Sequence, residues 1–203
     1  LTSTNTIQTN AGSITAILGG INGLTQSTTG TTMLGGANTY AGSTTISGGR
    51  LNVNGSITSN VTVQTGGTLG GTGTIHSANT VALQSGGTVA PGSSPGILHV
   101  GATTFVSGST FSVEANGATP GTDYDQLNVT GTINLGGATL ATTGGIMSSP
   151  GQTLVIVNND SNDPVVGTFA GLSEGSTVTI NGVNFLLSYV GGSNNNDVVL
   201  MEA

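Results

Sequence analysis

The chain has 203 residues, of which 36 are glycine, eight are Asp or Glu, and one, Arg50, is basic. Charged residues make up 4% of the sequence, against roughly 25% in ordinary soluble domains. This scarcity argues against nucleic acid as a partner, because neutralising phosphates requires Lys and Arg. No apolar run approaches the length of a transmembrane helix. The absence of cysteine leaves stability to packing and backbone hydrogen bonds.

The segment Leu1–Asn22 opens with Leu1-Thr2-Ser3-Thr4 and carries neither an initiating Met nor a signal peptide, so we expect a processed or excised piece of a longer product. No part of the chain shows the 3.6-residue apolar period of a helix, and glycine recurs too often for one. Because 34% of the residues are hydrophobic and they alternate regularly, the sequence predicts short β-strands rather than disorder.

Residues 23–53 carry an ordered series of features, which are Gly23-Leu24, Gly30-Thr31, Asn38-Thr39-Tyr40, Gly42, Thr44-Thr45-Ile46, and Gly48-Gly49 followed by Leu51 and Val53. In this order the features resemble the autotransporter-associated β-strand repeat of bacterial surface proteins. Gln26 departs from the repeat at a position where the family often carries Lys. The resemblance implies a passenger-type β-helix in a secreted bacterial surface protein.

Residues 56–100 contain one pattern twice, and the second copy repeats the first position by position. The matched pairs are Val61 and Val81, Val63 and Leu83, Gln64 and Gln84, Gly66-Gly67 and Gly86-Gly87, and Leu69 and Val89. A fixed period of short apolar alternations and paired glycines is typical of stacked coils, in which glycine allows sharp corners. Gln64 above Gln84 predicts a side-chain amide ladder. The phrases Gly66–Ile75 and Gly86–Val100 also resemble autotransporter passengers.

Residues 101–143 keep this alternation, and Tyr124–Leu140 again resembles the distal part of autotransporter passengers. Residues 151–203 differ in character. Leu154–Val157 is a continuous apolar run, typical of a strand buried on both faces. Val178–Phe185 predicts a hairpin, because Asn181-Gly182 fits a type I′ turn. We expect this block to cap the end of the stack, where strand edges would otherwise be unpaired.

The sequence therefore predicts an all-β protein, a right-handed parallel β-helix (β-solenoid) with about 20 residues per coil. Residues 1–150 form the stacked coils, and residues 151–203 form an antiparallel C-terminal β cap that continues the solenoid. At about 4.8 Å per coil, some eight to ten coils give a rod of roughly 40–50 Å.

Few residues suggest chemistry. His76 and His99 are the only histidines, and coils of this length could place them on one face, but with no further ligands near them we expect ordinary surface positions. Asp123 and Asp125 alternate along one strand, which is compatible with an acid pair for glycoside hydrolysis, although two acids on a turn are more often solvated. Lyase chemistry has even less support, because Arg50 has no basic companion.

Two runs near the C-terminus are rich in the oxygen ligands that Ca²⁺ prefers. Asn158–Asp163 fails the EF-hand spacing, and Gly191–Val199 resembles one copy of a calcium-binding nonapeptide that requires adjacent copies. Turn formation explains both runs, so Ca²⁺ is a minor alternative. Gly70–Gly73 lacks the Lys and the helix of a phosphate-binding loop. We therefore predict no catalytic, cofactor-binding or metal-binding residue, and no cofactor.

These observations predict an extracellular or cell-surface structural protein, a stalk or fibre that mediates adhesion and has host or surface glycans as partners. One alternative is a filament subunit that assembles head to tail with itself, because the apolar strands of residues 1–21 lack the Lys or Glu that would protect an open end. A second alternative is a polysaccharide-active β-helix enzyme that uses Asp123 and Asp125. We predict that the chain is not an enzyme and that it has no membrane-spanning segment.

Overall fold

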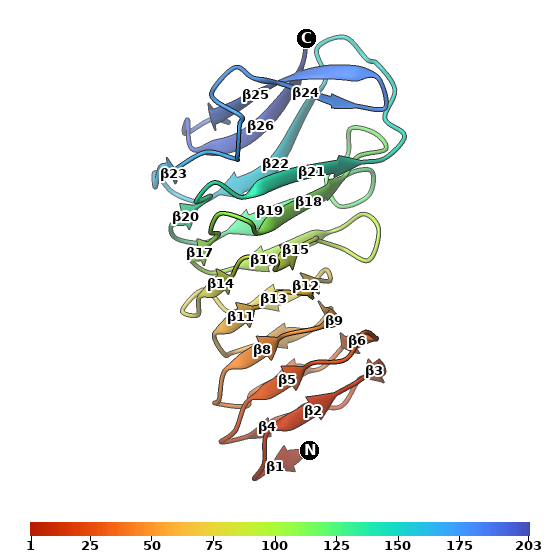
Figure 1. Cartoon of the computed structure of the whole chain (residues 1–203), viewed down its shortest axis with the longest axis vertical. Coiled ribbons are helices and arrows are strands. Elements are labelled where there is room, and N and C mark those ends of the chain that lie inside the picture. Colours follow the sequence, from red (N-terminus) through yellow and green to blue (C-terminus); the bar gives the residue numbers. More distant parts are fainter.

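The computed structural model describes all 203 residues as an elongated stack of short strands (Figure 1). The chain winds upward from the N-terminus, and its coils widen toward the C-terminal end (Figure 1). The structure contains no helical segment that could span a lipid bilayer.

Three sheets run along the stack. The first sheet contains β2 (Ile7–Thr9), β5 (Leu24–Gln26), β8 (Thr44–Ile46), β11 (Val61–Val63), β14 (Val81–Leu83), β17 (Thr103–Thr104), β20 (Ile133–Asn134) and β23 (Val165–Val166). The second sheet contains β3 (Gly12–Ile14), β6 (Thr31–Leu34), β9 (Gly49–Val53), β12 (Gly67–Gly70), β15 (Thr88–Val89), β18 (Thr110–Glu114) and β21 (Thr139–Thr143).

The third sheet begins with β7 (Ala37–Asn38), β10 (Ser56–Ile57), β13 (Thr74–Ile75), β16 (Ile97–Val100), β19 (Gln126–Val129) and β22 (Thr153–Asn159), all parallel. It ends with three antiparallel strands, which are β26 (Asp197–Glu202), β25 (Val183–Gly191) and β24 (Thr177–Ile180). At the N-terminal end β1 (Thr2–Ser3) pairs with β4 (Gly19–Gly20). The parallel β-helix and its antiparallel cap, both expected from the sequence, are thereby confirmed.

The length of a coil varies along the stack. The first sheet has eight rungs, at the lower end of the predicted range. Near the N-terminus one coil carries the chain from Ile7 to its register partner Leu24, whereas near the cap the much longer coil runs from Ile133 to Val165. The longer coils leave the ladder intact, because their extra residues lie in the corners between strands.

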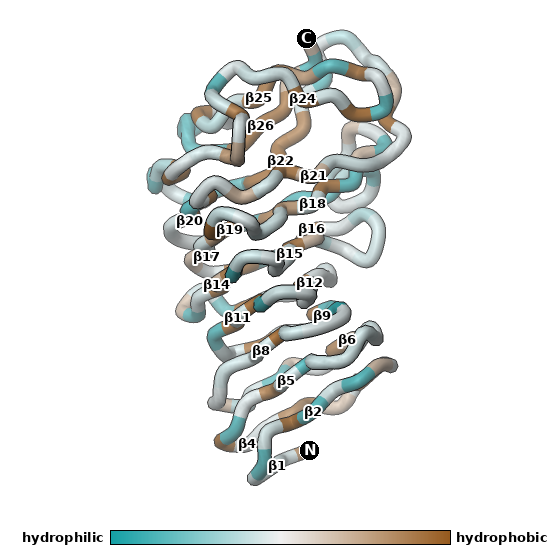
Figure 2. Tube along the Cα trace, viewed as in Figure 1, coloured by the Kyte–Doolittle hydropathy of each residue, from teal (hydrophilic) through white to brown (hydrophobic).

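Inward side chains form vertical columns that build one continuous core of 39 buried residues. In the second sheet, Leu51, Leu69, Val89 and Phe111 lie one above another and are fully buried. Figure 2 shows hydrophobic segments that recur from one rung to the next. Burying each such side chain contributes about 2 kcal/mol, and the pairing of Leu69 with Val89 confirms the predicted repeat.

Glutamine behaves differently from the expected ladder. Neither Gln64 nor Gln84 makes a side-chain hydrogen bond, and Gln84 is exposed at a corner where water can solvate its amide. A glutamine that is fully buried is Gln26, whose Oε1 accepts hydrogen bonds from the hydroxyls of Thr9 at 2.7 Å and Thr32 at 2.8 Å. It faces inward because it occupies the same register position as Ile46 one rung above. The predicted Gln64–Gln84 ladder is therefore wrong.

The cap closes the wide end of the stack. Ile180 pairs with Val183 across the predicted turn, and Asn181 and Gly182 have φ values of 48° and 80°, as a type I′ turn requires. An aromatic series joins the cap to the coils through contacts of Phe105 with Phe111, Phe111 with Phe169, and Phe169 with Tyr189, with ring centroids 6.0–6.1 Å apart.

Close packing between rungs should make some glycines irreplaceable. A Cβ on Gly23 would overlap the carbonyl oxygen of Ser43 in the next rung, whereas the nearest heavy atom to a Cβ on Gly35 would lie 3.7 Å away. We expect Gly23→Ala to lower the free energy of unfolding by about 2–4 kcal/mol and Gly35→Ala to change it by less than about 0.5 kcal/mol. Urea denaturation checks both values, and equal effects would contradict the tight rung spacing.

Candidate functional site

Charge is distributed unevenly along the stack. All eight Asp and Glu residues lie at or beyond Glu114, and Arg50 is the only Lys, Arg, Asp or Glu before it. The outward column of the second sheet that contains Arg50 is otherwise made of Thr31, Thr68, Thr88, Thr110 and Thr139. Arg50 is therefore a single cation among hydroxyl groups.

The Arg50 side chain reaches along the outside of the second sheet to the corner that follows β15. Its Nη2 donates to the carbonyl oxygens of Ala90 at 2.8 Å and Gly92 at 2.7 Å, and its Nε donates to Asn52 Oδ1 at 2.6 Å. Burial lowers the pKa of Arg50, and the Asp125 carboxylate opposes this shift. Because arginine keeps its proton in proteins, the side chain fixes a positive charge beside the corner.

Asp125 connects two rungs from a buried position, where it is 5% exposed. Its Oδ1 accepts a hydrogen bond from the backbone N–H of Gly96 at 2.8 Å, and its Oδ2 accepts one from the N–H of Glu114 at 2.9 Å. Burial raises the pKa of Asp125 to about 6, although these N–H donors and the Arg50 charge favour the ionised form.

Glu114 lies close to Asp125 and forms side-chain hydrogen bonds of its own. Its Oε2 accepts a hydrogen bond from Ser94 Oγ at 2.6 Å and its Oε1 accepts one from Asn116 Nδ2 at 2.8 Å. These two bonds lower the pKa of Glu114, so the carboxylate stays ionised near neutral pH.

These groups line a cavity of about 310 Å³, which we call the Arg50 groove. The residues that define it are Arg50, Ser93, Ser94, Ser112, Glu114 and Asp125. Both Asp125 oxygens already accept hydrogen bonds from backbone N–H groups, which hold this carboxyl in place as part of the wall. The arrangement suits binding through hydrogen bonds better than acid–base chemistry.

Asp123 and Asp125 form hydrogen bonds with separate partners. Asp123 is half-buried, and its Oδ2 accepts a hydrogen bond from the N–H of Thr119 at 3.0 Å. Hydrogen bonds from Thr119 lower the pKa of Asp123, whereas that of Asp125 is raised. The alternation in sequence therefore places Asp123 at a half-exposed corner and Asp125 beneath the groove.

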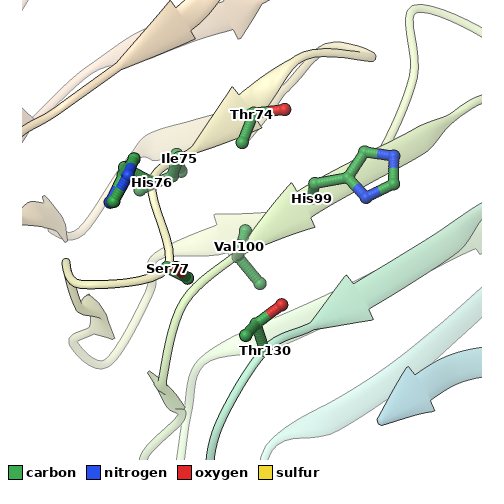
Figure 3. A pocket seen from close by; sticks show the side chains of 7 residues that line it. All are labelled: Thr74, Ile75, His76, Ser77, His99, Val100 and Thr130. Carbon is green, nitrogen blue, oxygen red and sulfur yellow. The ribbon is translucent and has the colours of Figure 1, made fainter. Parts of the chain in front are cut away.

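The two histidines line a second cavity, of about 330 Å³, with Thr74, Ser77 and Thr130 among its other residues (Figure 3). Their rings lie on opposite sides of it and do not point toward one another (Figure 3). His76 Nδ1 accepts a hydrogen bond from the N–H of Ala78 at 3.3 Å. Nowhere in the chain do three His, Cys, Asp or Glu residues gather as they would around a metal ion.

The structure brings together the two oxygen-rich runs that the sequence left apart. Asn196 Nδ2 donates to the carbonyl oxygens of Asn159, Asp160 and Ser161 at 3.3, 2.9 and 3.3 Å. Asp197 Oδ1 accepts a hydrogen bond from the N–H of Asn159 at 2.8 Å, and burial raises the pKa of Asp197. The amide nitrogen of Asn196 thus lies among these three carbonyl oxygens, in the position that a bound cation would need.

Sequence reasoning missed the Arg50 groove. Arg50, Ser94 and Glu114 lie far apart in the chain and meet only because the coils stack. A signal was present in the register, because Arg50 shares a column with Thr68, Thr88 and Thr110, and Glu114 ends the strand that Thr110 begins.

Comparison with known proteins finds two partial relatives. The chain is 43% identical over 83 residues to an extracellular serine protease of Serratia marcescens, a match that covers 41% of this chain and 8% of that protein. It is 46% identical over 81 residues to the adhesin BmaC autotransporter of Brucella suis biovar 1 (strain 1330), covering 38% of this chain and 2% of that protein. No family model matches. The likeness is thus to small parts of much longer proteins, one of which is an autotransporter.

The buried Asp125 carboxyl should make stability depend on pH. Its pKa of about 6 lies above the ordinary value of 3.8, so between these values the folded chain holds a proton that the unfolded chain has lost. We expect the contribution of Asp125 to the free energy of unfolding to fall by about 1–3 kcal/mol as pH rises from about 4 to about 7.

Urea denaturation of the native sequence and of Asp125→Asn, at about pH 4.5 and about pH 7.5, measures this effect. The substitution cannot ionise, so the fall with pH should be smaller in the variant. Asp197, whose pKa is also raised, remains in both proteins and cancels in the comparison. An identical pH dependence in the two proteins would rule out Asp125 as its source.

Proposed function

We propose that this chain is a segment of an extracellular adhesive β-helix of the autotransporter-associated repeat type, and that it forms part of a cell-surface stalk. The observation that carries the proposal is the parallel ladder of eight rungs, which makes a stiff rod and displays its sides along the whole length. Similarity to an autotransporter adhesin supports the extracellular or surface location.

The outer face of the first sheet supports a role in contact with surfaces. Its outward column is Gln8, Thr25, Thr45, Thr62, Ala82, Thr104 and Asn134. This face carries hydroxyl and amide groups and no charge, so it can hydrogen-bond to neutral glycans but offers no cation to a polyanion.

We also propose that the segment acts without catalysis. The matched part of the serine protease covers only 8% of that protein. No serine hydroxyl bonds to either histidine side chain, and a nucleophilic serine needs such a base. The absence of a paired acid at Asp123 and Asp125 likewise supports a binding role over glycoside hydrolysis.

Adhesion by the folded rod can be measured directly. We expect beads coated with this chain to attach to epithelial cells several-fold more often than beads coated with the Gly23→Ala chain, whose rung spacing is disturbed, when bound beads are counted by flow cytometry. Gly35→Ala serves as the matched control and should attach like the native sequence. Attachment no greater than that of bare beads would contradict the adhesive function.

The filament hypothesis is a second candidate, favoured by the first rung. Leu1, Ile17 and Ile21 there are 82%, 54% and 77% exposed, and β1, β2 and β3 each form the edge of their sheet. Exposed apolar groups beside strand edges favour pairing with a further coil, which a second copy of this segment can supply.

If head-to-tail assembly occurs, the sedimentation coefficient should increase over a hundredfold range of concentration. Ile17→Asp with Ile21→Asp should then abolish the increase, because each places a charge at the edge. Met147→Asp is the matched control, since Met147 is 79% exposed elsewhere. A constant monomer value for the native sequence would exclude the filament.

A further inference from the structure

Small residues line much of the Arg50 groove, among them Ala90, Ser93, Ser94 and Ser112. Gly70 lies one rung below Ala90 in the second sheet, beside the Arg50 side chain. A Cβ on Gly70 would overlap the Arg50 guanidinium. The guanidinium can therefore lie flat across this rung only because residue 70 is glycine, and it brings its charge to the corner of Ala90 and Gly92.

Free hydrogen-bonding capacity remains in this groove. Arg50 uses Nε and Nη2 within the chain, and its Nη1 makes no hydrogen bond. Each Glu114 oxygen accepts one hydrogen bond and can accept another. The Ser93 hydroxyl accepts a hydrogen bond from Asn52 Nδ2 at 3.1 Å and can still donate one, and the Ser112 hydroxyl can both donate and accept.

The backbone at one wall is held in an uncommon conformation. Ser94 has a φ of 132°, a region that residues other than glycine rarely occupy. Two carboxylates hold the corner in place, because Glu114 bonds to the Ser94 hydroxyl and Asp125 bonds to the N–H of Gly96. The position of the Ser94 hydroxyl is thus fixed before any ligand arrives, which lowers the entropy cost of binding.

The charges select the class of ligand. An anion would meet Arg50 but also the carboxylates of Glu114 and Asp125, and a cation would meet the guanidinium. A neutral polyol avoids both conflicts, because its hydroxyls can donate to Glu114 and accept from Arg50 Nη1. The cavity of about 310 Å³ lies at the lower end of the range for small-molecule sites.

We propose that the Arg50 groove binds one or two sugar units of a neutral polysaccharide. The proposal rests on the adhesive function proposed above, and it places recognition in a groove of the second sheet. Since no aromatic ring lines the groove, a single site lacks the large apolar contact that such rings supply and binds weakly. Many copies on one cell surface then supply the avidity that adhesion requires.

The test is a titration of the full chain followed by two-dimensional ¹H–¹⁵N NMR. The probes are maltotriose, mannotriose and xylotriose, with trigalacturonate as the acidic comparison. The informative signals are the amides of Gly96 and Glu114, which bond to Asp125 under the groove. We expect at least one neutral trisaccharide to shift both amides and trigalacturonate to shift neither.

Two variants and one control complete the test. Ser112→Leu fills the groove from an outward strand position, and Glu114→Gln removes the acceptor charge; each should weaken binding at least tenfold. Ser13→Leu makes the same change at an exposed position of β3, at the N-terminal end of the second sheet, and should leave binding unchanged. The dispersion of the NMR spectrum verifies that each variant is folded.

The proposal is overturned if no neutral trisaccharide shifts these amides, if the acidic probe binds more tightly, or if both groove variants bind like the native sequence. Bead attachment separates this result from the wider function. Attachment that persists in Ser112→Leu leaves the adhesive function standing and removes the groove from it. Sugar binding without bead attachment keeps the groove and removes adhesion.

Discussion

The vertical register between successive coils is the constraint on which this structure depends. Each strand of the parallel ladders pairs with its equivalents in the coils below and above, so an inward or outward position passes from rung to rung. A polar residue in an inward column must therefore find partners inside the stack. Gln26 does so through Thr9 and Thr32, because an unsatisfied buried amide would cost about 1–3 kcal/mol.

Corner residues are not bound by this register, and the polar groups of the Arg50 groove lie mostly at corners. Extra residues between strands do not disturb the ladder, so the upper coils can lengthen, as the one between Ile133 and Val165 does. Glu114 and Asp125 flank one such insertion, and Ser94 lies in the corner beneath it. Charged side chains are thus excluded from the buried inward columns, and carboxylates approach a cation at the corners instead.

Much of the fold could be predicted because it is local and periodic. The repeated pattern correctly paired Val61 with Val81, and Asn181-Gly182 correctly marked the hairpin of the cap. The prediction of a glutamine ladder was wrong. The repeat gives the register of the strands, but it does not show whether the side chain of a residue just beyond a strand points toward the equivalent residue in the next coil. Gln84 follows directly after β14 and is exposed to solvent.

The groove could not be predicted from the sequence. Because the coils differ in length, the number of residues between Arg50 and Asp125 does not show which positions lie next to one another in the stack. The two oxygen-rich runs near the C-terminus met for a different reason. Antiparallel pairing of β22 with β26 joins them, and no parallel period would indicate that contact. In both places the missing information was the length and direction of the connections between strands.

The solitary arginine has a consequence for resistance to proteolysis. Proteases of the trypsin type cleave only after basic residues, so the bond between Arg50 and Leu51 is the one place where they could divide the chain. That bond lies within β9, which is paired with β6 on one side and β12 on the other. Cleavage would require several rungs to open together. In the folded stack, the only bond that trypsin-type proteases recognise is therefore inaccessible to them.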